Sequence, residues 1–492
     1  MPMAGGSRWF RPDRTATRGR IRTVPPGPRR GARRPRRPAG PRSARRPARR
    51  SADTRPRDRT FRPVARSLPG PVRRRPTPGP SGDGGRRRNG TMAWARFLAG
   101  GAAIGREPAA SIPRDRRLDV MRGLALIVIF IDHMPGNLVA AVMPHAWGFC
   151  DAAELFVFLS GMSAAWGFGR TIDRLGPGAG GRKILARLGT IYVWHLIVFL
   201  AVVCLVAGAM ALTGDPAHSD AIDVDPLLDD TIGAAVAMLT LTYQPNYLNI
   251  LPLYLVLLAA YPLIHVLVCR SPLLALVLSA ALWRAAAHFQ IDLPAGDEEW
   301  FFNPLAWQMI FTFGVVAGRA ASAGLALPHG RAARAVDALA IAVVVFAAAV
   351  KLAEAGVLTL PALAPLVAME FGADKTNLDP ARLVHFAALA WLFLRAVPPT
   401  ARRLDGPVAR RLAAAGRHSL EVFAVGTILA VAGQIVMIET AFDPGVQLAT
   451  CAVGIAALIG LGAALSRPAV RATPTAASAS EAPNLATVSS GA

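Results

Sequence analysis

Long apolar runs, separated by short charged loops, dominate the sequence from residue 118 onward. Each run is long enough, with tilt or with charged side chains reaching the headgroups, to cross a hydrocarbon core about 30 Å thick. The ten runs are 118–134, 150–169, 188–212, 247–269, 272–288, 303–320, 335–353, 381–397, 418–438 and 446–466. Since 53% of the chain is apolar and only 17% is charged, we predict an all-α, polytopic integral membrane protein with about ten transmembrane helices.

The charges between these runs predict their orientation. If the ten runs alternate in direction, the basic loops fall on one side of the membrane and most acidic loops, such as 215–230 and 292–299, fall on the other. The positive-inside rule then places both termini in the cytoplasm. One shorter run, 231–243, would reverse this pattern if it crossed, but it reaches only about 20 Å at 1.5 Å per residue. We therefore predict a re-entrant or surface helix there.

Most of the positive charge lies before the first run. Residues 1–115 hold 31 of the 55 Lys and Arg residues but only six Asp and Glu, so the rest of the chain has a net charge of −1. This Arg- and Pro-rich composition predicts a disordered tail, as we also expect for 471–492 around a membrane domain at 116–470. The tail is either a basic arm for anionic lipid or nucleic acid, or a sign that translation starts at Met92. We favour the second interpretation and expect no nucleic-acid partner.

The first apolar run carries Arg122 near its start and His133 at its end. Eleven positions are about three helical turns, so the two side chains project from nearly the same face, roughly 16 Å apart along the axis. Ionisable side chains within a membrane usually mark function. Glu154, one turn into the second run, is the carboxylate we expect to orient His133 as a general base. The structural alternative is that Arg122 snorkels to the headgroups and His133 caps a helix; spacing alone leaves both open.

Several further polar residues stand at the ends of apolar runs on the predicted outer side, where amides, aromatics and charges suit a hydroxyl-rich ligand. They are Asn246, Tyr247, Asn303, Gln308, Lys375, Asn377, Arg382 and His385. Interfacial aromatic belts and an ordinary solvated loop are the competing explanations. His265 stands alone within a run, which is typical of a packing histidine. The four cysteines show no metal-ligand spacing, so we predict neither a disulfide nor a metal site.

Several motifs in the same order resemble the OpgC family, the succinyltransferases of osmoregulated periplasmic glucans, within the membrane acyltransferase-3 superfamily. These are Arg122 with ten residues before His133, ELFVFLSG (154–161), QPNYLNILPLY (244–254), FNPLAWQ (302–308), DKTNLDPARLVHF (374–386) and GRHSLEVF (416–423). The resemblance covers about 114–466, and the basic tail has no counterpart in it.

This resemblance implies an acyltransferase-3-like helical bundle in a bacterial inner membrane. It implies that Arg122 and His133 are the functional pair, and we place His418 with Arg122 on the acyl-CoA side. The implied reaction transfers an acyl group, expected to be succinyl, from cytoplasmic acyl-CoA to hydroxyls of a periplasmic glucan or related saccharide. Acyl-CoA is then a co-substrate, and no cofactor is expected. The alternative is a transporter or flippase of a saccharide or an anionic metabolite that forms no bond.

Overall fold

The computed structural model describes residues 92–100, 115–295 and 299–467, and this part of the chain is helical without any strand. The predictions for the basic tail before Met92 and for the tail at 471–492 lie outside the described residues. Residues 92–98 form a short helix. It is held by Trp94, whose indole N–H donates to the carbonyl of Ala326, and by the carbonyl of Leu98, which accepts from Ser271.

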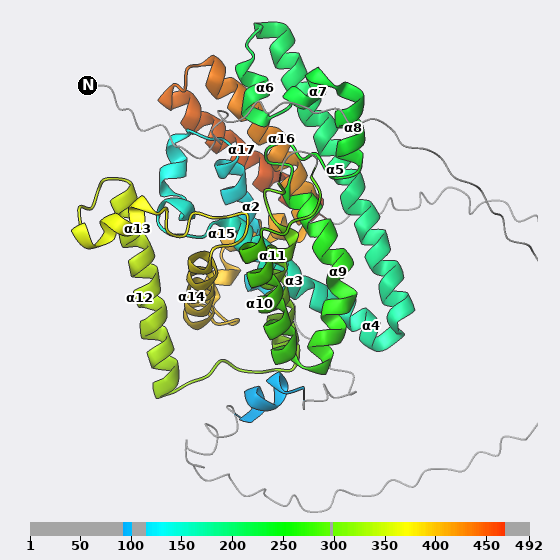
Figure 1. The fold of residues 1–492 in the computed structure, drawn as a ribbon, viewed down its shortest axis with the longest axis vertical. Coiled ribbons are helices and arrows are strands. Elements are labelled where there is room, and N and C mark those ends of the chain that lie inside the picture. Colours follow the sequence, from blue (N-terminus) through cyan, green and yellow to red (C-terminus); the bar gives the residue numbers. More distant parts are fainter. Residues whose placement is uncertain (1–91, 101–114, 296–298, 468–492) are drawn as a thin grey trace, which may run out of the picture. The chain divides into compact units, whose positions relative to one another are not determined.

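Every predicted apolar run overlaps a helix (Figure 1). These helices are α2 (Arg116–Asp132), α3 (Ala152–Ala164) with η3 (Ala165–Gly169) and α4 (Arg170–Leu175), α5 (Pro177–Thr213), α9 (Ile250–Arg270), α10 (Pro272–Phe289), α11 (Pro304–Ser322), α12 (Arg331–Glu354), α14 (Pro380–Ala396), α16 (Ser419–Glu439) and α17 (Pro444–Leu465). The largest difference from the predicted bounds is at α5, which begins at 177 rather than 188.

Seven helical segments in the described part of the chain are long and apolar enough to cross a membrane. They are the α3–α4 segment, α5, α9, α10, α12, α16 and α17. The structure is thus that of an all-α polytopic membrane protein. Of the predicted spans, α2, α11 and α14 fall outside these seven, so the total of ten stays a prediction.

Shorter elements connect these helices. They are η1 (Leu138–Val142), η2 (Pro144–Ala146), α6 (Ala217–Ile222), α7 (Asp225–Asp229), α8 (Thr231–Leu239), η4 (Pro361–Leu363), α13 (Ala364–Ala368), η5 (Arg402–Asp405) and α15 (Pro407–Arg417). The leftover run 231–243 contains α8, whose nine residues extend only about 14 Å. That length agrees with a helix that does not cross.

Four helices begin with the same local signal, a side-chain cap followed by proline. Ser271, Asn303, Asp379 and Asp443 each accept a backbone N–H near the start of the next helix, and proline follows each of them. Such caps satisfy donors that lack an intrahelical partner, and proline at the first helical position lacks the donor altogether. These pairs explain why α10, α11, α14 and α17 begin where they do.

Glycine allows two helices near the centre of the bundle to cross closely. A Cβ atom on Gly161 of α3 would lie 2.1 Å from the carbonyl oxygen of Phe311, and one on Gly314 of α11 would lie 2.1 Å from that of Phe158. Close approach of this kind is how helices associate in lipid, where van der Waals packing replaces the hydrophobic effect. The crossing holds α3 against α11. Helix α3 carries Glu154 and the cavity residues Phe156, Ser160 and Ser163.

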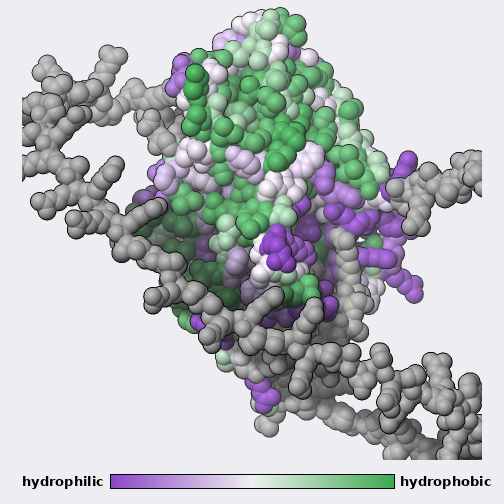
Figure 2. Space-filling model, turned by 90° about the vertical axis from the view of Figure 1, so that its right-hand side faces the viewer, coloured by the Kyte–Doolittle hydropathy of each residue, from purple (hydrophilic) through white to green (hydrophobic). Residues whose placement is uncertain are grey.

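Apolar side chains cover much of the outside. Leu185, Val193, Ile197 and Leu200 of α5 are all exposed, and Figure 2 shows apolar residues over the upper part of the face on this side, with hydrophilic residues gathered below. Helices apolar on their outward faces suit a lipid environment.

Two ends of the bundle are distinguished by their contacts. Arg117, at the start of α2, donates to the carbonyl of Val397 just after α14, and Asp173 of α4 joins His265 of α9 and Arg319 of α11. We call this the basic end, because arginines of α4, of the first two turns of α5 and of the last turn of α11 lie there. The opposite end, where α2 stops at His133, is called the His133 end.

Candidate functional site

A cavity of about 220 Å³ lies near the basic end, between α2, α3, η3, α5, α9 and α16. Three cationic side chains line it: Arg122 of α2, and Lys183 and Arg187 of α5. The other lining residues are Phe156, Ser160, Ser163, Gly167, Phe168, Leu251, Tyr254, Ser419, Leu420 and Phe423. Three cations among several hydroxyl groups favour an anionic ligand bearing phosphate or carboxylate groups.

One wall of this cavity contains a π-helical turn, η3. Its Gly167 carbonyl accepts a hydrogen bond from Lys183 Nζ at 2.9 Å, and Lys183 also donates to Thr171 Oγ1 at 3.2 Å. The ammonium lies 5.7 Å from the centroid of the Phe168 ring. The π turn, an element frequent at functional sites, therefore holds one of the cavity's cations in place.

Arg122 borders a second cavity of about 330 Å³ as well. Ser163 and Gly167 line both cavities, and the second is completed by Asp115, Leu118, Asp119 and Trp166. The Arg122 guanidinium donates to the Leu159 carbonyl of α3 at 2.9 Å. This contact positions the side chain between the two spaces, where it can reach a ligand in either.

Two phenylalanines of the first cavity lead towards the His133 end. The rings of Phe156 and Phe423 lie 6.2 Å apart, and the ring of Phe423 lies 6.4 Å from the His133 imidazole in an edge-on arrangement. Phe423 is 3% exposed. It therefore contributes to the cavity wall and also contacts His133.

His133 is half-buried and directly follows α2. Its imidazole packs on the Tyr247 ring at 4.8 Å between centroids, and its Nδ1 atom is buried with no hydrogen-bond partner among the described residues. The charges of Lys375 and Asp151 are close enough to act on the imidazole. Buried polar atoms are nearly always hydrogen-bonded, so an unpartnered ring nitrogen is an unusual feature that can mark a functional site.

Glu154 has other partners than the expected His133. Its carboxylate accepts hydrogen bonds from the Arg382 guanidinium, 2.8 Å from Nε, and from the backbone N–H of Asp151. Glu154 is fully buried, and Arg382 is 6% exposed. No hydrogen bond joins Glu154 to His133 in the described part of the chain. The carboxylate instead links the start of α3 to α14 through Arg382.

Lys375 extends this network of charges. Its Nζ lies 2.6 Å from Asp151 Oδ2, which is also 3.4 Å from Arg382 Nη2. The ammonium also lies over the rings of Phe301 and Phe302, within 5.6 Å of each centroid. Lys375 and Arg382, two of the polar residues predicted from the sequence, thus both contact Asp151.

His385 contacts Cys150 and Phe149 rather than His133. It is 3% exposed, its Nδ1 is 3.1 Å from the Cys150 sulfur, and Phe149 packs against its ring. These contacts close it off from a soluble ligand, so they favour a packing role over substrate binding.

Three of the predicted sugar-binding amides have partners within the protein. Asn303 caps α11 and also donates to Asn377 and to the carbonyl of Ile291. Gln308 exchanges hydrogen bonds with Ser279 between α10 and α11. These bonds explain the presence of Asn303, Gln308 and Asn377 by a structural role instead of sugar binding. The bond from Asn303 to Asn377 helps to hold the loop that carries Lys375, together with two tryptophan N–H donors, the half-buried Trp283 and the buried Trp307.

The remaining predicted residues lie at both ends. Tyr247 has a left-handed backbone (φ 69°), which is rare for a bulky residue and often found at functional sites. Asn246 is half-buried in the same loop, where its N–H donates to the Ile222 carbonyl. His418 precedes α16 at the basic end; its neighbour Ser419 lines the cavity, whereas His418 does not.

Sequence reasoning missed Lys183, Arg187 and Phe423. The two cations were counted as loop charges because the apolar run begins at 188. They are four residues apart, so they share one face of α5. This i, i+4 spacing was the available signal. Phe423 carried none, because a phenylalanine within an apolar run is ordinary.

Comparison with known proteins gives one match. The sequence model of a protein family described as OpgC protein matches residues 114–469, which is more than half of the chain. No curated protein and no solved structure matches it. The matched region contains every helix from α2 to α17 and all residues of the two cavities.

Proposed function

The chain belongs to the OpgC family, and on that premise we propose that it is an integral-membrane O-acyltransferase. It transfers an acyl group, expected to be succinyl, from cytoplasmic acyl-CoA to a hydroxyl of a periplasmic glucan or related saccharide. Membership of the family implies a glucan-modifying acyltransferase role, and the apolar helices agree with a membrane location. The acyl donor, the acceptor, the direction of transfer and the bacterial inner membrane are the parts that we propose.

The observation that carries this proposal is that Arg122 and Phe423 line the same cavity and that Phe423 also contacts His133. Phe423 lines a cavity with three cations, and its ring also contacts an imidazole with an unpartnered nitrogen. One ligand could therefore bind by its anionic groups near the basic end and place its reactive end near a base. Acyl-CoA has this form, since phosphates and thioester stand at opposite ends of a narrow arm.

At the basic end, Arg122, Lys183 and Arg187 bind the phosphates of acyl-CoA. Charge-assisted hydrogen bonds to phosphate are stronger than neutral ones, and the planar arginine fork can donate two at once. The acyl chain then points along the cavity towards Phe156 and Phe423. In this arrangement the thioester lies within the bundle, away from bulk water.

At the opposite side of Phe423, His133 is the general base. Its unpartnered nitrogen accepts the proton of a sugar hydroxyl while the hydroxyl oxygen attacks the thioester carbonyl carbon. The carbon–sulfur bond breaks, CoA leaves as the thiolate, and the proton on His133 can pass to it. A positioned base of this kind contributes about 10²- to 10⁴-fold in rate.

The groups near His133 suit a hydroxyl-rich acceptor. Tyr247 packs against the imidazole, and Lys375 and Asp151 provide a donor and an acceptor nearby. Phe301 and Phe302 add apolar ring surface next to Lys375. In this proposal Glu154 and Arg382 are positioning residues that keep Asp151 in place.

The test uses the purified full-length protein with succinyl-CoA and periplasmic glucan. We expect free CoA and acylated glucan, measured by chromatography and mass spectrometry, to form in equal amounts and only when both substrates are present. Parallel assays with acetyl-CoA identify the preferred acyl group. Glucan or metabolite movement across a vesicle membrane with the thioester intact would contradict the enzyme and support a transporter.

A further inference from the structure

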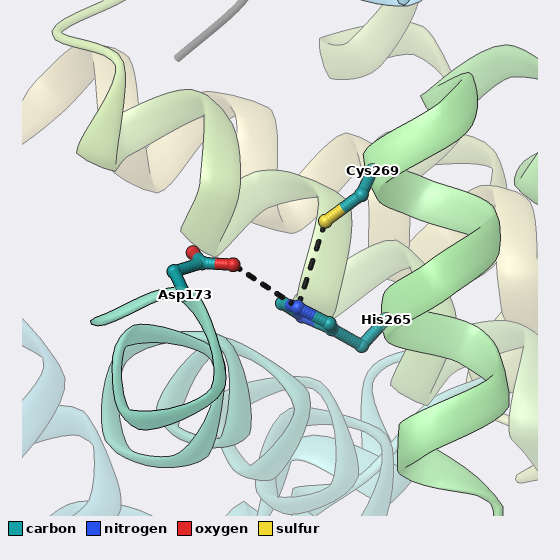
Figure 3. Close-up of side chains that lie close together, drawn as sticks. All are labelled: Asp173, His265 and Cys269. Atoms are coloured by element: carbon teal, nitrogen blue, oxygen red, sulfur yellow. Dashed lines mark hydrogen bonds and ion pairs between the residues drawn. The ribbon is translucent and has the colours of Figure 1, made fainter. Parts of the chain in front are cut away.

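Three side chains with metal-binding atoms meet at the basic end. Figure 3 shows Asp173 of α4 facing His265 and Cys269 of α9. One carboxylate oxygen, one imidazole nitrogen and the sulfur all lie within 4.8 Å of one another. His265 and Cys269 are four residues apart, so they share one face of α9. His265, which the sequence favoured as a satisfied packing histidine, thus has three polar neighbours.

The distances match the edges of a tetrahedral zinc site. The His265 Nε2 atom is 3.2 Å from Asp173 Oδ1 and 3.6 Å from Cys269 Sγ. Zinc bonds of about 2.0–2.3 Å at tetrahedral angles separate neighbouring ligand atoms by about 3.3–3.6 Å. An ion placed among the three atoms would thus need little rearrangement on the two edges that involve His265.

The outer partners of these side chains orient them as metal ligands are oriented. Tyr261, which is fully buried, places its hydroxyl 3.2 Å from His265 Nδ1, so Nδ1–H can donate to it while Nε2 stays available. Arg319 Nη1 donates to Asp173 Oδ2 at 2.6 Å, which leaves Oδ1 towards His265. Such second partners normally fix the tautomer and the direction of histidine and carboxylate ligands.

Access to the cluster is open on one side. His265 is 3% exposed, whereas Cys269 and Asp173 are exposed. An ion can therefore enter from that side, and a water molecule can fill the fourth position. Nitrogen, oxygen and thiolate together favour zinc over calcium or magnesium, which prefer oxygen alone.

We propose that Asp173, His265 and Cys269 bind one Zn²⁺ ion, with water as the fourth ligand, and that the ion joins α4 to α9. This inference does not depend on the proposed acyl transfer, because no residue of the cluster lines either cavity. Without a metal, the same residues would form only an ion-pair network of Asp173 with His265 and Arg319.

Thiol alkylation of the purified full-length protein tests the proposal. Cys269 and Cys204 are both exposed and free, but only Cys269 belongs to the cluster. After chelator treatment, a membrane-permeant maleimide such as N-ethylmaleimide should label both, with Cys204 the slower because it lies within the apolar run 188–212. Zn²⁺, but not Mg²⁺, should slow labelling of Cys269 at least tenfold and leave Cys204 unchanged. Equal labelling of Cys269 with and without Zn²⁺ would overturn the proposal.

Metal content gives the second measurement. After equilibration with Zn²⁺ and desalting, the wild type should retain about one ion per chain, and Co²⁺ should give a thiolate charge-transfer band. Cys269→Ser should abolish the band and weaken Zn²⁺ binding at least tenfold. Asp173→Asn should also weaken Zn²⁺ binding at least tenfold. The control Cys204→Ser should match the wild type. Retention of the band by Cys269→Ser, or no bound ion in the wild type, would contradict the site.

Discussion

The aromatic ring of Phe423 lies 6.4 Å from the imidazole of His133 while also lining the cavity that contains Arg122. A single side chain thus borders the cationic cavity and contacts the proposed base. If the thioester ends at this ring, the size of the side chain decides whether water can reach the thioester. It also decides how closely the thioester approaches His133.

The first prediction concerns this separation. Phe423→Leu keeps an apolar side chain but leaves a gap, so acyl-CoA hydrolysis without glucan should rise relative to transfer. The loss in unfolding free energy should stay below the about 3–5 kcal/mol typical of Phe→Ala in a core. Chromatographic analysis of CoA released with and without glucan measures the ratio. Phe346→Ala, a change outside the cavity lining, is the control, and an unchanged ratio for Phe423→Leu would remove Phe423 from the path.

The second prediction concerns the cations of α5. Arg187→Gln removes charged hydrogen bonds worth about 1.5–3 kcal/mol, so acyl-CoA should bind about 10- to 150-fold more weakly. Added salt should weaken the wild type more than the variant, since one charge contact is already lost. Arg182→Gln is the matched control, because Arg182 belongs to the same helix but does not line the cavity. Equal affinities for the two variants would place the phosphates elsewhere.

The sequence predicted the part of this site that depends on a single helix. Arg122 and His133 are eleven positions apart on α2 and its C-cap, and the period of an α-helix relates them without knowledge of the rest of the fold. The pairing of Glu154 with Arg382 joins residues 228 positions apart. No local pattern indicates such a contact, so the sequence assigned Glu154 to the nearest ionisable candidate, His133.

Asn303 shows a different limit. The amide lies among aromatics, which suggested sugar binding, but the proline that follows it is also a signal for a helix start. The structure shows that Asn303 caps α11 and also holds the loop of Asn377. Lys183 and Arg187 were missed because the apolar run begins at 188, whereas α5 in fact begins at Pro177.

The third prediction concerns Glu154. Glu154→Gln leaves the buried Arg382 guanidinium without its main partner, and the loss of one member of a buried ion pair costs about 3–5 kcal/mol. Thermal unfolding in detergent should show a large decrease in stability, while transfer per folded molecule should fall only modestly, because Glu154 acts on the acceptor site through Asp151. Asp337→Asn, in the more exposed pair with Arg395, should change the unfolding temperature much less. A stable Glu154→Gln protein without transfer activity would instead support direct orientation of His133.

The fourth prediction concerns orientation in the membrane. In a variant without the native cysteines, a cysteine introduced at Asp225 should react with an impermeant maleimide from the outer side. A cysteine at Arg331 should react only after the inner side is made accessible, because the basic loops remain in the cytoplasm. Labelling at Arg331 from outside would reverse the sides proposed for acyl-CoA and glucan.

The last prediction separates the two members of the pair on α2. Arg122→Lys keeps a positive charge but loses the planar fork that binds a phosphate with two hydrogen bonds and also contacts the Leu159 carbonyl. Acyl-CoA affinity should fall by about 10- to 150-fold, as expected for about 1.5–3 kcal/mol of charged hydrogen bonding. His133→Ala should bind acyl-CoA almost normally, since His133 does not line the cavity, but transfer should fall by about 10²- to 10⁴-fold. Binding and single-turnover transfer, measured for each purified variant, distinguish the two defects. Both proteins should insert, because neither change adds a charge to the membrane. Full transfer by His133→Ala would show that this histidine only caps α2 and packs against Tyr247.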